Sequence, residues 1–132
     1  MLTNKIAQRV YITGAACYND CTANKEPSMK KCKITAVRTA RYDDLMEKYE
    51  NPIEHACDIR EGDTFIANGW TRPAGLCESA WESMSPFVLA LSCGGEGIYG
   101  GWMKNRKSAM ISCNDGFRPV SFYIEALDED AD

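Results

Sequence analysis

The chain has 132 residues, of which 45% are hydrophobic and 26% are charged, and its formal net charge is −4. These values are typical of a single soluble globular domain. The acidic balance argues against a nucleic-acid surface, and no apolar run reaches the roughly 18 residues that a membrane span needs. We therefore expect a cytoplasmic protein that binds neither nucleic acid nor membrane.

Three segments are expected from the composition. Residues 1–28 are loop-like and form an N-terminal extension, and one hypothesis is that translation begins at Met29 instead. Residues 29–127 form a single α+β domain. Residues 128–132 are an acidic tail that we expect to be solvated.

The first half of the domain shows short periodic segments. Alternation predicts a strand over residues 31–39, and apolar residues at helical spacing predict an amphipathic helix within 41–50. Asn51-Pro52 ends that helix, and a loop follows. Residues 63–67 form a second strand, which a turn at Asn68-Gly69 closes.

The second half predicts a helix and a hairpin. Residues 75–93 are mainly helical, and Pro86 predicts either a kink or two consecutive helices. Asp115-Gly116 is a signal for a two-residue turn, which would place Cys113 opposite Arg118 on a largely apolar sheet face. The order β-α-β-α-β-β predicts an α+β fold with a small, mainly antiparallel sheet and helices packed on one face.

The seven cysteines are odd in number and scattered along the chain. Cys113 is the leading functional candidate, because a nearby cation such as Arg118 favours the thiolate. Cys77, in the first turn of a helix, has the same advantage from the helix dipole. For each, the alternative is a buried cysteine that acts as a small hydrophobe. Cys93, at a helix C-terminus, is expected to be structural.

A metal site is a further possibility. Zinc accepts four thiolates, or three thiolates and one imidazole, and it would need ligands from several separate elements. The spacing signal is weak because none of the ligands forms a Cys-x-x-Cys pair. The candidate ligands are Cys32, Cys57, Cys77, Cys113 and His55, which is the single histidine, whereas Cys17 and Cys21 are treated as incidental.

The glycine-rich loop at residues 95–100 fits G-x-G-x-x-G, but it follows a helix and not a strand, so a dinucleotide site is not expected. Tyr99 and Trp102 would form the apolar wall of a ligand lid; alternatively, Trp102 anchors the loop to the core. The acids of residues 58–63 lack a histidine, serine or lysine partner nearby, and we expect them to be solvated.

Several motifs in one order resemble a family of small cysteine-containing bacterial and archaeal proteins that is labelled as an uncharacterised repeat protein. The matching segments are MKKCKITAVRT, HACDIREGDTF, RPAGLCESAWESMSPFVLALSCGG, WMK and SCNDGFRPVSFYIEAL, and they span about residues 29–127. The resemblance implies no activity. This chain departs from the family pattern at Ser112, where many relatives have a second cysteine. The departure weakens any interpretation that needs vicinal thiols. The repeat label implies that a single-copy chain pairs with itself.

Three functions stay open from the sequence. The first is a thiol-dependent binding protein for a soft metal or for redox chemistry, with zinc or another soft metal as the possible ligand and the cofactor otherwise unknown. The second is a small-molecule enzyme in which Cys113 is the nucleophile and Arg118 binds an anionic group. The third is a structural or interaction module, expected to be a homodimer. The small-molecule ligand is not identified.

Overall fold

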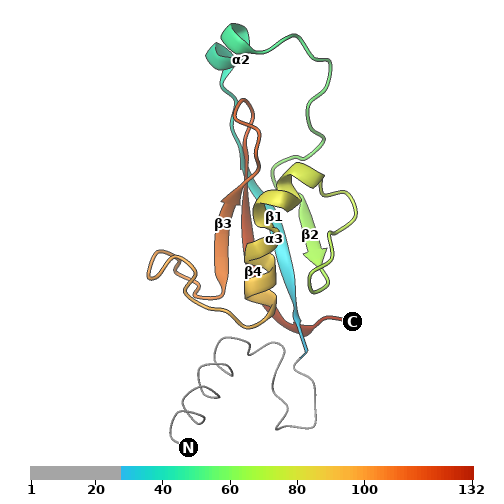
Figure 1. Cartoon of the computed structure of the whole chain (residues 1–132), viewed down its shortest axis with the longest axis vertical. Helices are drawn as coiled ribbons and strands as arrows, with labels where there is room; N and C mark the ends of the chain where they lie inside the picture. The colour runs from blue at the N-terminus through green and yellow to red at the C-terminus, as the bar shows by residue number, and fades with distance from the viewer. Residues whose placement is uncertain (1–27) are drawn as a thin grey trace, which may run out of the picture.

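A computed structural model of the protein describes residues 28–132 (Figure 1). The elements follow the predicted order of strands and helices. They are β1 (Lys30–Thr39), α2 (Asp43–Tyr49), β2 (Thr64–Ala67), α3 (Glu78–Ser92), β3 (Ser108–Ser112) and β4 (Val120–Asp130). The predicted extension, and with it Cys17 and Cys21, lies outside the described residues apart from Ser28.

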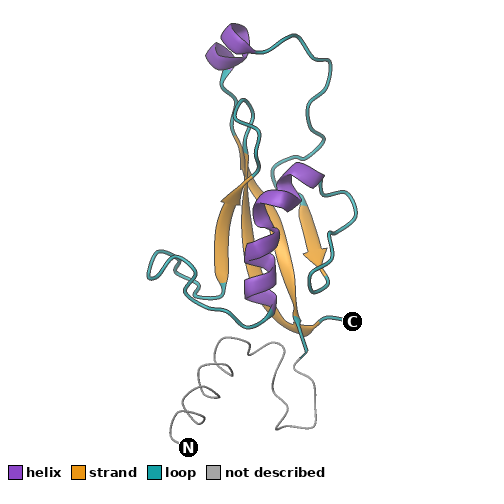
Figure 2. Ribbon diagram, in the orientation of Figure 1, coloured by secondary structure: helices purple, strands orange, loops and turns teal. Residues whose placement is uncertain are grey.

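The four strands form one antiparallel sheet in the order β2-β1-β4-β3, which confirms the α+β prediction. The two longest strands, β1 and β4, lie side by side in its centre. α3 packs across one face of the sheet (Figure 2). α2 lies in the segment between β1 and β2, residues 40–63, which extends beyond the end of the sheet and is called the arm below (Figure 1). The expectation that both helices cover one face therefore holds for α3 alone.

The core lies between α3 and the sheet. Alternate residues of β1 and β4 point toward the helix, and α3 contacts them with apolar residues spaced three or four apart. The two-residue period of the strands and the helical period of α3 therefore place apolar side chains at one interface. The fully buried members are Cys32, Ile34, Ala36, Phe122 and Ile124 from the sheet and Ala80, Met84, Val88 and Leu91 from the helix.

α3 is a single helix that runs through Pro86. Proline has no N–H to donate to the preceding turn, which favours a kink. Figure 2 shows the first turns of α3 inclined to the rest, which agrees with the predicted kink. The helix ends at Ser92, just before the predicted Gly94, which has a φ of 89° and whose N–H donates to Leu91 O at 3.0 Å.

The β3–β4 hairpin has a different register from the one predicted. Ile111 lies opposite Phe122, and the N–H of Cys113 donates to Val120 O at 3.1 Å, so Cys113 faces Val120 and not Arg118. The error is two residues, which leaves the paired side chains of β3 and β4 on their predicted faces, whereas Arg118 lies in the loop. Two features widen the loop: the side chain of Asp115 accepts hydrogen bonds from the next backbone N–H groups, and Pro119 cannot donate to the ladder.

The first residues of the acidic segment 128–132 are the end of β4, and their side chains are exposed, as the solvated tail predicts. β4 runs through Asp130 and pairs with the start of β1. Lys31 donates to Glu129 at 2.9 Å, a bond that raises the pKa of Lys31, and Lys30 pairs with Asp130. Lys30 and Lys31 are thus both paired with acidic side chains of the C-terminal segment.

Neither helix within residues 28–132 combines the length and the apolar character that crossing a bilayer requires.

Candidate functional site

A groove of about 480 Å³ lies where the arm joins the sheet. One wall is the end of β1 with the residues that follow it, Thr39–Arg41. The second wall is the extended segment Ile53–Cys57 with Ile59, and Arg118 and Val120 close the groove from the hairpin side. Three of the predicted site residues line it together: His55, Cys57 and Arg118.

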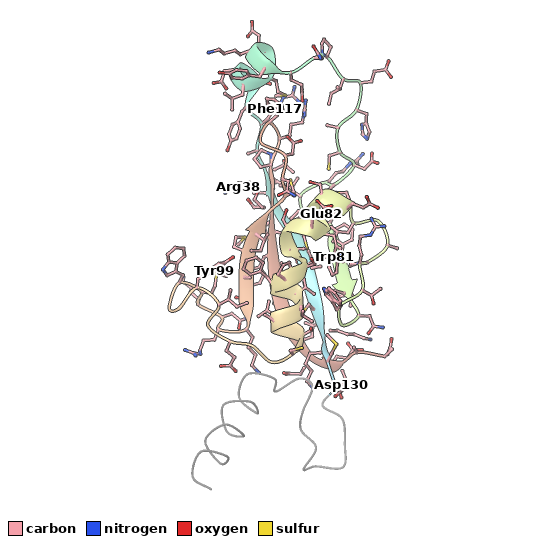
Figure 3. All side chains as sticks on the ribbon, viewed as in Figure 1. Arg38, Trp81, Glu82, Tyr99, Phe117 and Asp130 are labelled. Carbon is pink, nitrogen blue, oxygen red and sulfur yellow. The ribbon has the colours of Figure 1, made fainter. Side chains whose placement is uncertain are left out.

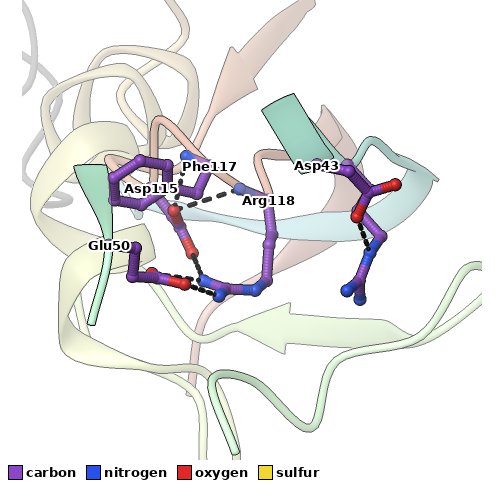
Figure 4. Close-up of polar contacts among 6 residues, drawn as sticks. Asp43, Glu50, Asp115, Phe117 and Arg118 are labelled. Atoms are coloured by element: carbon purple, nitrogen blue, oxygen red, sulfur yellow. Dashed lines mark hydrogen bonds and ion pairs between the residues drawn. The ribbon is translucent and has the colours of Figure 1, made fainter. Parts of the chain in front are cut away.

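Arg118 is fixed by two carboxylates (Figure 4). Its Nη1 donates to Glu50 Oε2 at 3.1 Å, its Nη2 donates to the other oxygen of Glu50, and Nη1 lies 3.6 Å from Asp115 Oδ2. The hydrogen bonds that Arg118 donates to Glu50 raise the pKa of Arg118 further above its ordinary value. Because Glu50 and Asp115 neutralise it, this guanidinium is not free to bind an anion. It acts as a clamp that joins the β3–β4 loop to the segment after α2.

The backbone around Arg118 explains this position. Asp115 Oδ1 accepts hydrogen bonds from the N–H groups of Phe117 at 2.8 Å and Arg118 at 3.1 Å, which is the geometry of an Asx turn. The N–H of Ala40 donates to Pro119 O at 2.9 Å and ties the loop to the strand end. Arg118 therefore leaves the hairpin ladder and reaches the segment that follows α2.

His55 forms a short contact with Asp58: its Nε2 lies 2.6 Å from Asp58 Oδ1. Because an ionised carboxylate is an acceptor, Nε2 carries the proton, and Nδ1 is left as the acceptor when the ring is neutral. The sequence interpretation missed this pair, since it expected no histidine partner for the acids of residues 58–63. The His-x-x-Asp spacing was the signal that could have found it.

Cys57 is an exposed free thiol on the same wall of the groove as His55. Its Sγ accepts a hydrogen bond from the N–H of Ile59 at 3.4 Å. Residues 55–57 belong to no helix or strand, so the alternation of a β-strand does not set the directions of the His55 and Cys57 side chains. Two residues apart, the thiol and the imidazole face one concave surface.

The other predicted thiols lie elsewhere. Cys32 is fully buried in the core with its Sγ 3.8 Å from Val88 O, and burial raises its pKa to about 11. Cys77 is the N-cap of α3, and its Sγ accepts from Ala80 N at 3.4 Å. Cys113 is half-buried, and its Sγ accepts from Val120 N at 3.3 Å.

These positions do not support the predicted metal site. Within residues 28–132, no three histidine, cysteine or acidic side chains are grouped so that they could hold a metal ion. The physical reason is that Cys32 faces the helix across the core, whereas Cys57 and Cys77 are exposed on separate segments. Nor does Arg118 serve Cys113, because the hairpin register separates them and carboxylates occupy the guanidinium.

Cys93 is the C-cap of α3, as the sequence predicts, and it is disulfide-bonded.

The glycine-rich loop does not line the groove. The hydroxyl of Tyr99 donates to Met110 O at 3.0 Å, and its ring lies against Phe87. Trp102 contacts Tyr99 with ring centroids 5.7 Å apart and is 84% exposed, so it does not anchor the loop to the core. Figure 3 places Tyr99 beside the sheet, whereas Phe117, the neighbour of the groove residue Arg118, lies at the far end near α2. The glycine-rich loop therefore does not cover the groove.

Comparisons with known proteins leave the family open, because no family model, no curated protein and no solved structure matches the chain.

Proposed function

We propose that this chain is a thiol-dependent binding protein whose site is the groove at the base of the arm, with Cys57 as its reactive group. The observation that carries the proposal is that, among the free cysteines of residues 28–132, Cys57 is the one that lines this groove. A thiol on a concave surface meets a bound molecule, whereas a thiol on a convex surface meets bulk solvent.

The ligand class follows from the size and the chemistry of the groove. A volume of about 480 Å³ is that of a site for a small molecule. The cations that line the groove are already paired, Arg118 with Glu50 and Arg41 with Asp43 at 2.7 Å, so charge alone does not select the ligand. The thiol of Cys57 is then the group that selects the ligand, and the ligand class that we propose is a low-molecular-weight disulfide.

The proposed step is thiol–disulfide exchange. Cys57 gives its proton to Nδ1 of His55, and the thiolate attacks one sulfur of the bound disulfide. A new S–S bond to Cys57 forms as the old one breaks, and the released half leaves as a thiolate that takes up the proton. Asp58 keeps the proton on Nε2 of His55, so that Nδ1 stays available as the acceptor.

Oxidised glutathione is a suitable probe. The full-length protein is incubated with it, and the products are identified by intact mass and by peptide mapping. We expect one glutathionyl group at Cys57 and its loss in Cys57→Ser. Cys77→Ser is the matched control, since Cys77 is also an exposed free thiol and does not line the groove. Absence of modification at Cys57 would overturn the proposal.

A second candidate function is a small-molecule enzyme in which Cys57 is the nucleophile. The contact between His55 and Asp58 favours it, because an imidazole oriented by a carboxylate beside a thiol is the arrangement of covalent catalysis. Chromogenic thioesters separate the two functions. Release of one equivalent of product supports binding without turnover, and continued release that Cys57→Ser abolishes supports an enzyme.

The cytoplasmic location and the family resemblance stay predictions from the sequence.

A further inference from the structure

The turn that follows β2 contains the one Asn-Gly pair of the sequence, Asn68-Gly69. Figure 1 shows this turn beside the C-terminal end of β4. The N–H of Asp132 donates to Asn68 Oδ1 at 2.8 Å, and the N–H of Ala131 donates to Met29 O at 2.7 Å. The side chain of Asn68 therefore ties Asp132 to the turn, one residue beyond the bond that Ala131 makes with the residue before β1.

The side-chain amide of Asn68 is arranged to lose ammonia. The residue is exposed, and within residues 28–132 its Nδ2 makes no hydrogen bond, so no bond to the protein retains the leaving nitrogen. Oδ1, by contrast, accepts the hydrogen bond from the N–H of Asp132. That donor stabilises the negative charge that develops on Oδ1 when a nucleophile attacks Cγ.

The backbone nitrogen of Gly69 is the nucleophile next to this amide. Gly69 is buried, and in the part of the chain that the structure describes its N–H donates no hydrogen bond. A buried N–H without a partner costs free energy, and closure of a ring through this nitrogen removes the N–H. Because glycine has no Cβ, its own side chain does not hinder the approach of its nitrogen to Cγ of Asn68.

We propose that Asn68 is a site of spontaneous deamidation in the folded protein. The nitrogen of Gly69 loses its proton and attacks Cγ of Asn68. The Cγ–Nδ2 bond breaks, and Nδ2 takes up a proton and leaves as ammonia while a five-membered succinimide ring closes. Water then opens the ring. Opening at one carbonyl gives aspartate, and opening at the other gives isoaspartate, in which the main chain runs through the former side-chain carbon.

The other asparagines of residues 28–132 lack this combination of features. Asn51 precedes Pro52, which has no N–H to supply the nucleophile. The amide of Asn105 donates from Nδ2 at 3.3 Å and accepts at Oδ1 at 3.0 Å. That of Asn114 donates at 3.2 Å and accepts at 3.0 Å. In both, a hydrogen bond retains the nitrogen that is free in Asn68.

The two products differ in their effect on Asp132. Aspartate at position 68 keeps an oxygen where Oδ1 lies, so the N–H of Asp132 keeps an acceptor. Isoaspartate adds a carbon to the main chain of the turn and moves the carboxylate, so this hydrogen bond is lost. We expect Asp132 to leave the turn only in the isoaspartate form, whereas Ala131 keeps its bond to Met29.

Peptide mapping of the full-length protein during incubation at mildly alkaline pH tests the deamidation. We expect conversion at Asn68 at least tenfold faster than at Asn105 and Asn114, with aspartate and isoaspartate both formed. Asn68→Gln is the matched control, because its longer side chain would have to close a larger ring, and conversion at position 68 should be lost. No conversion at Asn68, or conversion only after unfolding in urea, would overturn the proposal.

Amide hydrogen exchange measured by NMR tests the effect on Asp132. In the isoaspartate form, the Asp132 amide is expected to lose its protection, while the Ala131 amide keeps its own. Asn68→Ala removes the acceptor and should reproduce this loss, whereas Asn68→Asp should retain the protection. Equal protection of the Asp132 amide in Asn68→Ala and in the wild type would contradict the role of Asn68 as the tie.

Discussion

The guanidinium of Arg118 donates two hydrogen bonds to the carboxylate of Glu50 and so joins the β3–β4 loop to the C-cap of α2. Both side chains are largely covered, at 19% and 16% exposed. Glu50 also begins the segment that carries Ile53–Cys57, which is one wall of the groove. This ion pair therefore holds the groove in its present shape.

Loss of the pair is expected to loosen the groove. Arg118→Ala leaves Glu50 without its partner and lowers the melting temperature, and it speeds proteolysis within residues 50–59, measured by limited digestion and mass spectrometry. Arg118→Lys keeps the charge but loses the two-pronged geometry, so we expect an intermediate result.

Arg41→Ala is the control for this prediction. Arg41 also pairs with a carboxylate, that of Asp43, but these side chains are 68% and 77% exposed, and such pairs contribute little. We expect no change in melting temperature or digestion. Equal effects of Arg118→Ala and Arg41→Ala would contradict the role of Arg118 as a clamp.

Cys32 makes stability depend on alkaline pH. Burial raises the pKa of its thiol from 9.0 to about 11, so between these values the unfolded state loses a proton that the folded state keeps. Its contribution is fully present below pH 9 and is lost as the pH rises toward 11. Urea unfolding from pH 8 to 11 is expected to show a steeper loss of unfolding free energy in the wild type than in Cys32→Ala. Parallel curves would show that the thiol is not buried in the folded state.

Two glycines of one loop are expected to differ sharply when replaced by alanine. A Cβ at Gly95 would lie 2.7 Å from Ala90 O, in the turn that ends α3, whereas a Cβ at Gly101 meets nothing within 4 Å. Gly95→Ala should cost roughly 1–3 kcal/mol of unfolding free energy because backbone must shift. Gly101→Ala should be neutral or slightly stabilising, since it restricts the unfolded chain. Chemical denaturation measures both, and equal effects would contradict the packing at Ala90.

The sequence predicts those parts of the fold that depend on local periodicity. β1 and β2 come within one residue of expectation, and α2 lies inside its predicted range, because alternation and helical spacing are properties of short segments. The hairpin faces are right for the same reason. Its register is two residues off because Asp115 and Pro119 create a longer loop, and the turn signal at Asp115-Gly116 does not reveal those hydrogen bonds.

The candidate site was less accessible to prediction. His55 and Cys57 were predicted together as metal ligands, and Arg118 was predicted as the partner of Cys113. Nothing local indicates that Arg118 lines one groove with the other two. The partner of Arg118 is Glu50, which lies far away in the sequence and carries no motif. The sequence also did not reveal that Tyr42, Leu45 and Tyr49 of α2 are exposed, because their apolar spacing is the same as that of a helix packed on a sheet.

His55 and Asp58 are expected to promote the reaction of Cys57. His55→Ala removes the proton acceptor, and Asp58→Asn removes the carboxylate that holds Nε2, so both should slow mixed-disulfide formation at Cys57 several-fold at neutral pH. The rate at Cys77 is the internal reference in the same samples and should not change. Unchanged rates at Cys57 in both variants would show that the imidazole takes no part.

The central claim, that Cys57 reacts with a molecule bound in the groove, is tested most directly by the rate of its modification as oxidised glutathione is increased. Binding before reaction predicts that the rate at Cys57 levels off at high concentration, while the rate at Cys77 rises in proportion. A rate at Cys57 that also rises in proportion, and that equals the rate measured after unfolding in urea, would contradict the account.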